Sequence, residues 1–356
     1  MANRSDRGLP SLYAVQDFES IQEMRRGSAD FIRASRHSAC TNRPDIKLQP
    51  LCPDTLKSFL AKEGRPYRNR MIFVERGIYQ RREPEGEPLA LFVDVSKSGV
   101  EYPREFRSPI PFTALHDNVS MYVDDLFADS PSYGATYLYC SFPHTFVDVN
   151  RHELDLDPAI LNGEWPVPLK PHLRTLKGLG LIKTKSRYGE AMQERKLTVA
   201  EVEERLATYY RPYHREMKRI VDALYDRYGV LRHISGHCMS AVGAPTHIDP
   251  GKPRADFCIS DLNGVTSSRE FVDLIAATLR NFGYSVAIND PYIGNELIRR
   301  YGDPAHRIDS IHFEINKKLY MDINTFRATP GFARVKQDIG RLMQVVAEDT
   351  RKRMRR

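Results

Sequence analysis

The pattern of apolar and polar positions along the chain changes near residue 88. Residues 1 to about 50 are polar and mixed in charge, so we expect residues 1–87 to form an N-terminal extension, partly disordered or packed on the core. From residue 88 onward, short apolar segments alternate with longer segments of helical periodicity. The short segments predict strands at 88–95, 135–142, 232–235, 255–260, 285–289 and 310–315.

The longer segments between these strands predict helices. Residues 198–229 have apolar positions at helical spacing, with Pro212 expected to kink or divide the helix and Gly229 to end it. A helix that begins with a serine cap is expected at 267–283, and a final helix at about 331–353. Strands separated by helices are typical of βαβ units. We therefore expect an α/β fold with a mostly parallel or mixed central sheet and helices on both faces.

The composition is that of a globular protein. The chain has 356 residues, of which 41% are hydrophobic, enough for one large domain or two modest ones. No segment approaches the ~18 consecutive apolar residues of a membrane helix, and the first segment, MANRSDRGLP, is polar. The cysteines are scattered and show no Cys-x-x-Cys spacing, which favours reduced thiols. We expect a cytoplasmic protein that makes no membrane contact.

The net charge of +7 raises the question of a nucleic-acid partner. Much of this charge lies near the ends, above all in the basic run RKRMRR at 351–356. No reading motif with interleaved aromatic residues accompanies the run, so we expect a solvated tail and no nucleic-acid partner. The alternative, a module that binds nucleic acid or an acidic partner, predicts a strongly salt-dependent affinity that is lost when 351–356 are removed.

Polar side chains that directly follow buried strands are the first candidates for chemistry, because the strand fixes their position at one edge of a parallel sheet. One histidine, one glutamate, one arginine and one lysine from separate strands could together bind a carboxylate and hydrolyse a bond. We therefore expect a small-molecule substrate that carries a carboxylate. The candidates are Lys97 after LFVDV, then Asp148, Asn150 and Arg151 after PHTFV, His237 after RHIS, and Glu314 and Asn316 within and after IHFEI.

Each candidate also has a structural interpretation. A single histidine such as His237 is more often a hydrogen-bonded structural residue than a metal ligand. Arg151 could form an ion pair on its own acidic loop, RHELDLD. Glu314 lies in an otherwise apolar strand, where an unpaired buried carboxylate is strongly unfavourable. Glu314 therefore needs either a buried partner or a function.

The order of several segments resembles one enzyme family. The segments are VDVSKSGVEYP, VDDLFADSPSYGATYLYCSFPHTFVDVNRHELDLDP, GEWPVPLKP, GLGLI, TVAEVEERLATYYRPYH, HISGHCM, RADFCISDLNGVTSS, GYSVAINDPYIGNELIRRYG and FEINKKLYMD. Together they resemble the N-formylglutamate amidohydrolase family over about residues 88–325. The resemblance implies an α/β fold similar to zinc carboxypeptidases and aspartoacylase, and hydrolysis of N-formylglutamate to formate and glutamate. It makes 88–325 the catalytic domain and 326–356 a C-terminal helix with a basic tail.

The resemblance further implies a zinc ion held by three side chains. In the family, a Pro-His-Ser-Gly turn supplies the first ligand, an Asp-x-x-Val-Asp element the second, and the histidine of an Asp-Cys-His-Ser-Met block the third. His237 matches the third ligand, but Lys97 stands at the first position and Ser120 at the second. Asp124, which ends the corresponding SMYVD segment, is a further candidate ligand. Zinc is thus expected from the resemblance, although two of its three ligand positions are altered.

The same resemblance assigns roles to the remaining candidates. Glu314 matches the general base of the Glu-Ile-Asn block, and Asn150 and Arg151 match the pair that holds the substrate carboxylate. Asn316 completes the Glu-Ile-Asn block and is a further candidate for substrate binding. Lys97 joins Glu314 as a catalytic candidate because its ammonium is a substitute positive charge at a ligand position.

Three hypotheses follow. In the first, which we favour, the chain is a working amidohydrolase in which His237 and a shifted ligand, Asp124, Asp117 or His116, hold zinc for the water that Glu314 deprotonates. In the second, the chain is a metal-free pseudoenzyme whose Lys97 pairs with Glu314 and whose cleft binds an acidic ligand or partner. In the third, Lys97 or Cys238 carries the chemistry itself.

Overall fold

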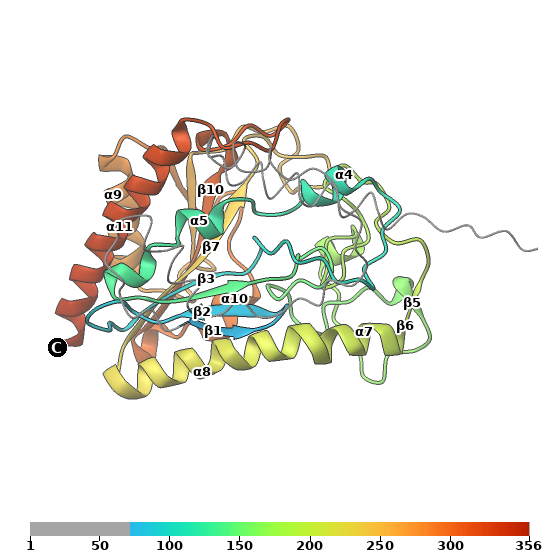
Figure 1. The fold of residues 1–356 in the computed structure, drawn as a ribbon, viewed down its shortest axis with the longest axis horizontal. Coiled ribbons are helices and arrows are strands. Elements are labelled where there is room, and N and C mark those ends of the chain that lie inside the picture. The colour runs from blue at the N-terminus through green and yellow to red at the C-terminus, as the bar shows by residue number, and fades with distance from the viewer. Residues whose placement is uncertain (1–71, 356) are drawn as a thin grey trace, which may run out of the picture.

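The structure, a computed structural model, describes residues 72–355, which fold around an eight-stranded mixed sheet (Figure 1). The strands lie in the order β1-β2-β4-β3-β7-β10-β8-β9. The four central strands β4, β3, β7 and β10 are parallel, and the flanking strands β2 and β8 run antiparallel to them. The strands are β1 (Ile72–Glu75), β2 (Tyr79–Arg82), β3 (Leu91–Val95), β4 (Thr136–Cys140), β7 (Leu231–Met239), β8 (Phe257–Ser260), β9 (Val286–Ile288) and β10 (Ile308–Asn316).

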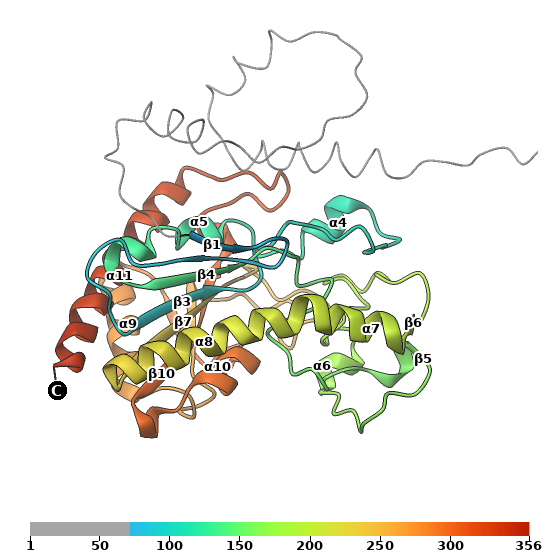
Figure 2. The same ribbon diagram turned by 60° about the horizontal axis from the view of Figure 1, so that its bottom comes forward.

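Helices cover both faces of this sheet, as the alternation of strands and helices predicts (Figures 1 and 2). Helix α8 packs on one face, in a core that includes Phe92, Leu138 and Met217. Helices α5, α9 and α11 pack on the other face, around Val93 and Phe313. The helices are α4 (Phe112–His116), α5 (Val123–Leu126), α6 (Leu173–Leu176), α7 (Val199–Arg205), α8 (Arg211–Tyr228), α9 (Arg269–Asn281), α10 (Glu296–Tyr301) and α11 (Gly331–Met354).

The sheet begins earlier in the chain than the pattern predicts. Strands β1 and β2 lie within the expected extension 1–87, and β2 pairs with β4 in the main sheet. Strand β2 has the sequence YQRR and contains no apolar run, whereas β1, the edge strand, has the sequence IFVE and is only four residues long. The boundary at residue 88 therefore falls inside the folded domain. The expectation for the segment 1–71 lies outside the described residues.

The predicted helix over 198–229 forms as two helices joined by a π-helical turn. Helix α7 ends at Arg205, residues 206–210 form the turn, and Pro212 lies in the first turn of α8. Proline is tolerated there because the first helical N–H groups have no partner within the helix. Gly229 ends α8 in the left-handed conformation with φ 63°. Beside this helix pair, the short strands β5 (Leu161–Asn162) and β6 (Leu197–Thr198) form a separate two-stranded sheet (Figure 2).

Strand β7 is longer than expected, which changes the setting of His237. The apolar run RHIS predicts a strand that ends before His237, but β7 continues to Met239. Strand β10 pairs with it in parallel, and the register places Glu314 opposite His237. Both side chains therefore project from the same face of the sheet. Gly236, which precedes His237 and faces the other side of the sheet, must lack a side chain, because a Cβ atom there would lie 2.9 Å from the Phe127 ring.

The basic C-terminal run is part of the fold over its described residues. It continues α11, which ends at Met354. Arg351 forms an ion pair with Glu87 at 3.0 Å, and Arg353 lies 3.5 Å from the buried Asp309. The expectation of a solvated tail is therefore wrong for Arg351 and Arg353, whose guanidinium groups form ion pairs with the folded domain. No helix among residues 72–355 is long and apolar enough to cross a membrane.

Candidate active site

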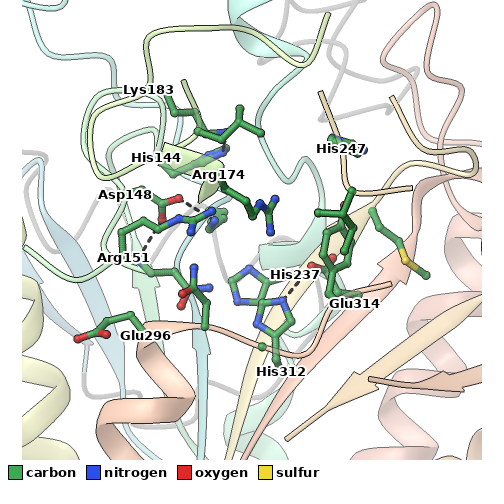
Figure 3. Close-up of a pocket in the computed structure, with 18 of the residues that line it drawn as sticks. His144, Asp148, Arg151, Arg174, Lys183, His237, His247, Glu296, His312 and Glu314 are labelled. Atoms are coloured by element: carbon green, nitrogen blue, oxygen red, sulfur yellow. Dashed lines mark hydrogen bonds and ion pairs between the residues drawn. The ribbon is translucent and has the colours of Figure 1, made fainter. Parts of the chain in front are cut away.

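A cavity of about 800 Å³ opens at the carboxyl ends of the parallel strands β3, β4, β7 and β10 (Figure 3). This is the edge where open α/β sheets bind their ligands. The cavity brings together Lys97, Asn150, Arg151, His237 and Glu314 from the predicted set. Asn316 and Asp124 are not among the residues that line it.

His237, His312 and Glu314 form the floor of the cavity. The rings of His237 and His312 stack with centroids 4.0 Å apart and an interplanar angle of 26°. His312 donates a hydrogen bond from Nε2 to Oε1 of Glu314 at 2.9 Å, and Ser235 Oγ lies 2.9 Å from Nε2 of His237. Burial lowers the pKa of His237, and His312 and Lys97 lower it further, so this imidazole is neutral at pH 7.

Glu314 has one carboxylate oxygen that is already bound and one that is not. Its Oε1 accepts from His312, whereas its Oε2 is buried and has no hydrogen-bond partner among the described residues. Burying such an atom is unfavourable unless a ligand or water satisfies it. Figure 3 shows Glu314 on one side of the stacked rings, and His144, Asp148, Arg151 and Lys183 on the other. Glu314 is thus a proton acceptor, and the side of the cavity opposite to it is rich in basic residues.

Lys97 pairs with Asp148 and not with Glu314. Its Nζ lies 2.8 Å from Asp148 Oδ2, and the carboxylate side chain is 1% exposed. Burial alone would raise the pKa of Asp148, but Lys97, together with His144 and Arg151, lowers it well below its usual value. The pairing of Lys97 with Glu314 that the metal-free hypothesis predicts is therefore wrong. The sequence does not reveal this, because Asp148 reaches Lys97 only through the loop after β4.

The three predicted substrate-binding residues have different settings. Arg151 lies 3.7 Å from Asp155, and its Nε has no partner among the described residues. Asn150 lines the cavity, but its Oδ1 accepts from the backbone N–H of Leu297 at 3.0 Å. Asn316 donates to the carbonyl of Ala255 at 3.0 Å and thereby holds the loop before β8. Of the three, Arg151 has the donor that a carboxylate can use.

The positions that the resemblance assigns to zinc ligands do lie around one cavity. Lys97, Ser120 and His237 all line it, and the backbone N–H of Ser120 donates to the carbonyl of Lys97 at 2.9 Å. Only His237 has a metal-binding side chain. Among residues 72–355, no three His, Cys, Asp or Glu side chains are placed to hold one metal ion. The side chains in this structure therefore do not fit the three-ligand zinc site that the resemblance implies.

The shifted ligands do not complete the set. Asp117 lines the cavity, but it forms an ion pair with Arg187 at 3.3 Å. His116 is buried beside Tyr102, whose hydroxyl lies 3.2 Å from its Nδ1, and it is not among the lining residues. Asp124 belongs to α5, away from the cavity lining.

Several cavity residues are absent from the sequence-based set. His312 is two positions before Glu314 in β10 and therefore lies on the same face, so the alternation of the strand could have identified it. Lys183 directly follows the apolar GLGLI segment, which is the same signal that identified Lys97. His144 and Arg174 have no such signal, because they come from irregular or very short elements. Tyr292 also lines the cavity, and burial and Glu314 raise its pKa to about 12.

The family model for N-formylglutamate amidohydrolase matches residues 89–321 of this chain. The chain belongs to the N-formylglutamate amidohydrolase family. A family member of solved structure, N-formylglutamate amidohydrolase from Ralstonia eutropha JMP134, is 37% identical and superposes with a TM-score of 0.73, over 78% of this chain and 99% of that one. The predicted family and the predicted α/β fold are thus confirmed.

Two other relatives are more distant. The N-formylglutamate deformylase of Pseudomonas putida is 24% identical over 204 residues, which make up 56% of this chain and 70% of that protein. A gene product of Agrobacterium tumefaciens is 17% identical with a TM-score of 0.52, over 78% of this chain and 99% of that one, and it shares the fold alone. The family match ends at residue 321, before α11 begins.

Proposed function

We propose that this protein hydrolyses the amide bond of an N-formyl or N-acyl acidic amino acid, with water as the nucleophile. Glu314 carries the proposal, because its Oε2 is buried at the cavity wall with no partner among the described residues. The cavity lining supports an anionic substrate, since nine lysine and arginine side chains line it against five carboxylates. Family membership and the name of the Pseudomonas putida relative support the reaction type.

Arg151 would bind a carboxylate of the substrate. Its guanidinium is buried, at 5% exposure, and its Nε is not used by the described residues. Charge-assisted hydrogen bonds from arginine to a carboxylate are among the strongest in proteins, and the planar guanidinium also fixes the orientation of the bound group. Binding the carboxylate in this way would hold the amide at a fixed position relative to Glu314.

Glu314 would act as the general base. It accepts a proton from water, the water oxygen attacks the carbonyl carbon, and Glu314 then returns the proton to the amine nitrogen as the C–N bond breaks. The products are formate, or another carboxylate, and the free amino acid. His312 positions Glu314 through the hydrogen bond at 2.9 Å. His237 stacks on His312 and is neutral, so it adds no positive charge beside Glu314.

Lys97 would supply positive charge near the oxygen that becomes negative in the transition state. It stands at the position of the first expected ligand and is 2.8 Å from Asp148, which orients it. A fixed cation near a developing oxyanion accelerates acyl transfer because its orientation is set before the reaction.

The reaction would take place in the cytoplasm, which the free thiols of Cys140, Cys238 and Cys258 support.

The test is formate release from N-formyl-L-glutamate, followed by NMR, with wild-type protein and the Glu314→Gln variant. We expect turnover by the wild type and a loss of at least about 100-fold in kcat for Glu314→Gln. Glu270→Gln is the matched control, because Glu270 is exposed on α9 and outside the cavity lining. A wild-type protein that releases no carboxylate from N-formyl-L-glutamate, N-formyl-L-aspartate or N-acetyl-L-glutamate would end the proposal. Full activity in Glu314→Gln would show that another group is the base.

A further inference from the structure

Lys183 is partly buried, and it has an unusual partner for a lysine in that setting. Its Nζ lies 2.8 Å from Nε2 of His144, and both residues line the cavity. Buried ammonium groups normally pair with carboxylates, because an unpaired buried charge is costly. Lys183 forms an ion pair with no carboxylate among the described residues, and His144 is only 4% exposed. The charge of Lys183 therefore lacks a counterion in this part of the chain.

The groups around Lys183 further disfavour a positive charge on its side chain. Lys97, Arg151 and Arg174 all contribute positive charge at its Nζ, and Asp148 alone among the named neighbours contributes negative charge. Asp148 is already bound to Lys97 at 2.8 Å. Arg174 likewise has no ion pair among the described residues, and its Nε is buried without a partner there. This wall of the cavity thus holds more cations than anions.

We propose that Lys183, His144 and Arg174 form a second anion subsite, which takes the side-chain carboxylate of an acidic substrate while Arg151 takes its α-carboxylate. The inference rests on the proposed function and assigns the residues that would select an acidic amino acid. A second, independent observation supports it: Nδ1 of His144 is also buried without a partner among the described residues. Imidazole N–H, ammonium and guanidinium groups are all donors, which is what a carboxylate requires.

Proton linkage provides a signature of this subsite. Burial and, next, the positive charge of Lys97 lower the pKa of Lys183 to about 7, and Asp148 opposes the shift. Burial, Lys183 and Lys97 also lower the pKa of His144, so His144 remains neutral when Lys183 titrates. A carboxylate beside Lys183 would favour the ammonium and raise its pKa. Ligand binding at pH 8 should therefore take up a proton.

The first experiment compares N-formyl-L-glutamate with N-formyl-L-glutamine, which has the same shape and no side-chain charge. We expect the wild type to prefer the glutamate substrate in kcat/KM, and we expect Lys183→Met and Arg174→Met each to reduce this preference by at least about 10-fold. Lys170→Met and Lys177→Met are matched controls, because both lysines are exposed and line the same cavity. A preference that is unchanged in both Lys183→Met and Arg174→Met would overturn the proposal.

The second experiment does not depend on turnover, so failure of the subsite and failure of the proposed function can be told apart. Calorimetry at pH 8 in buffers of different ionisation enthalpy measures glutarate and butyrate binding together with proton uptake. In the wild type, we expect glutarate to bind more tightly than butyrate and its binding to take up a proton. In Lys183→Met, we expect the affinity difference and the proton uptake both to be lost. Equal binding of the two acids by the wild type, or proton uptake that persists in Lys183→Met, would contradict the subsite.

Discussion

Strands β7 and β10 present two different faces, so that one pair of strands serves both stability and chemistry. On the face toward α9 and α11, Ile234, Ile311 and Phe313 are fully buried in an apolar core. On the opposite face, the same strands carry His237, Glu314 and a row of other polar residues. Alternation along a strand makes this possible, because neighbouring side chains point to opposite faces.

The polar face also changes along its length. At its deep end, His233 lies 2.8 Å from Asp94 and 2.7 Å from Ser310, and Tyr213 donates to Asp94. Both nitrogens of His233 are therefore satisfied. At the cavity end, Nδ1 of His312 and Oε2 of Glu314 are buried and have no partner among residues 72–355. Burial of polar groups alone therefore does not mark a site, whereas buried groups with open hydrogen-bonding capacity do.

The largest change, in zinc content, is expected from restoring the two altered ligand positions beside the polar face, in the cavity lining. The double variant Lys97→His/Ser120→Asp adds two metal-binding side chains to the cavity that His237 lines. Because a zinc site needs about three protein ligands, we expect the wild type to retain no stoichiometric zinc after dialysis and the double variant to retain one equivalent. Metal analysis of the purified proteins measures this.

The single variants Lys97→His and Ser120→Asp are the controls for the zinc measurement, since each supplies only two ligands together with His237. A double variant that takes up no zinc would show that Lys97 and Ser120 are not at ligand positions. One equivalent of zinc in the wild type would show that other side chains provide the site.

The next largest effect is on the free energy of unfolding, and it compares adjacent residues of β10 that point to opposite faces of the sheet. Phe313→Ala removes a fully buried ring that packs against Phe127 and Phe257, and we expect it to lower the free energy of unfolding by about 3–5 kcal/mol. Glu314→Gln keeps the shape of the side chain and should change that free energy by less than about 1 kcal/mol. Urea denaturation measures both. Equal losses in the two variants would contradict the division between the faces.

A smaller effect is expected from Lys97→Met, which leaves the buried Asp148 without its ammonium partner. Because the folded-state pKa of Asp148 is lowered, the pair stabilises the protein above the ordinary carboxyl pKa, and this contribution is lost as the pH falls through the folded-state value. We expect Lys97→Met to lose about 2–3 kcal/mol at pH 7 and less below about pH 4. Thermal and urea unfolding across this pH range measure the difference.

The double variant Lys97→Met/Asp148→Asn is the control for the ion pair. Removing both charges should recover most of the stability that Lys97→Met loses, because no unpaired buried carboxylate remains. A loss in Lys97→Met that is independent of pH would show that packing, and not the ion pair, is responsible.

Much of the fold could be predicted from local pattern. The apolar runs identified the strands that became β3, β4, β7, β8, β9 and β10, and the helical periodicity identified α8, α9 and α11. Strand β1 escaped because it is only four residues long, and β2 escaped because YQRR has no apolar run. The end of β7 escaped because Gly236 and His237 interrupt its apolar run. Such residues are recognised as part of a strand only through pairing with a neighbour, here β10.

The family, the α/β class and the chemical nature of four site residues follow from the amino-acid sequence; these residues are Glu314, Arg151, Lys97 and His237. Tertiary structure alone decided their partners: Asp148 for Lys97, His312 for Glu314 and His144 for Lys183. The reason is physical, because strand periodicity and residue type are local properties of the chain. Ion pairs and hydrogen bonds depend on distances of a few ångströms between loops that only the folded sheet brings together.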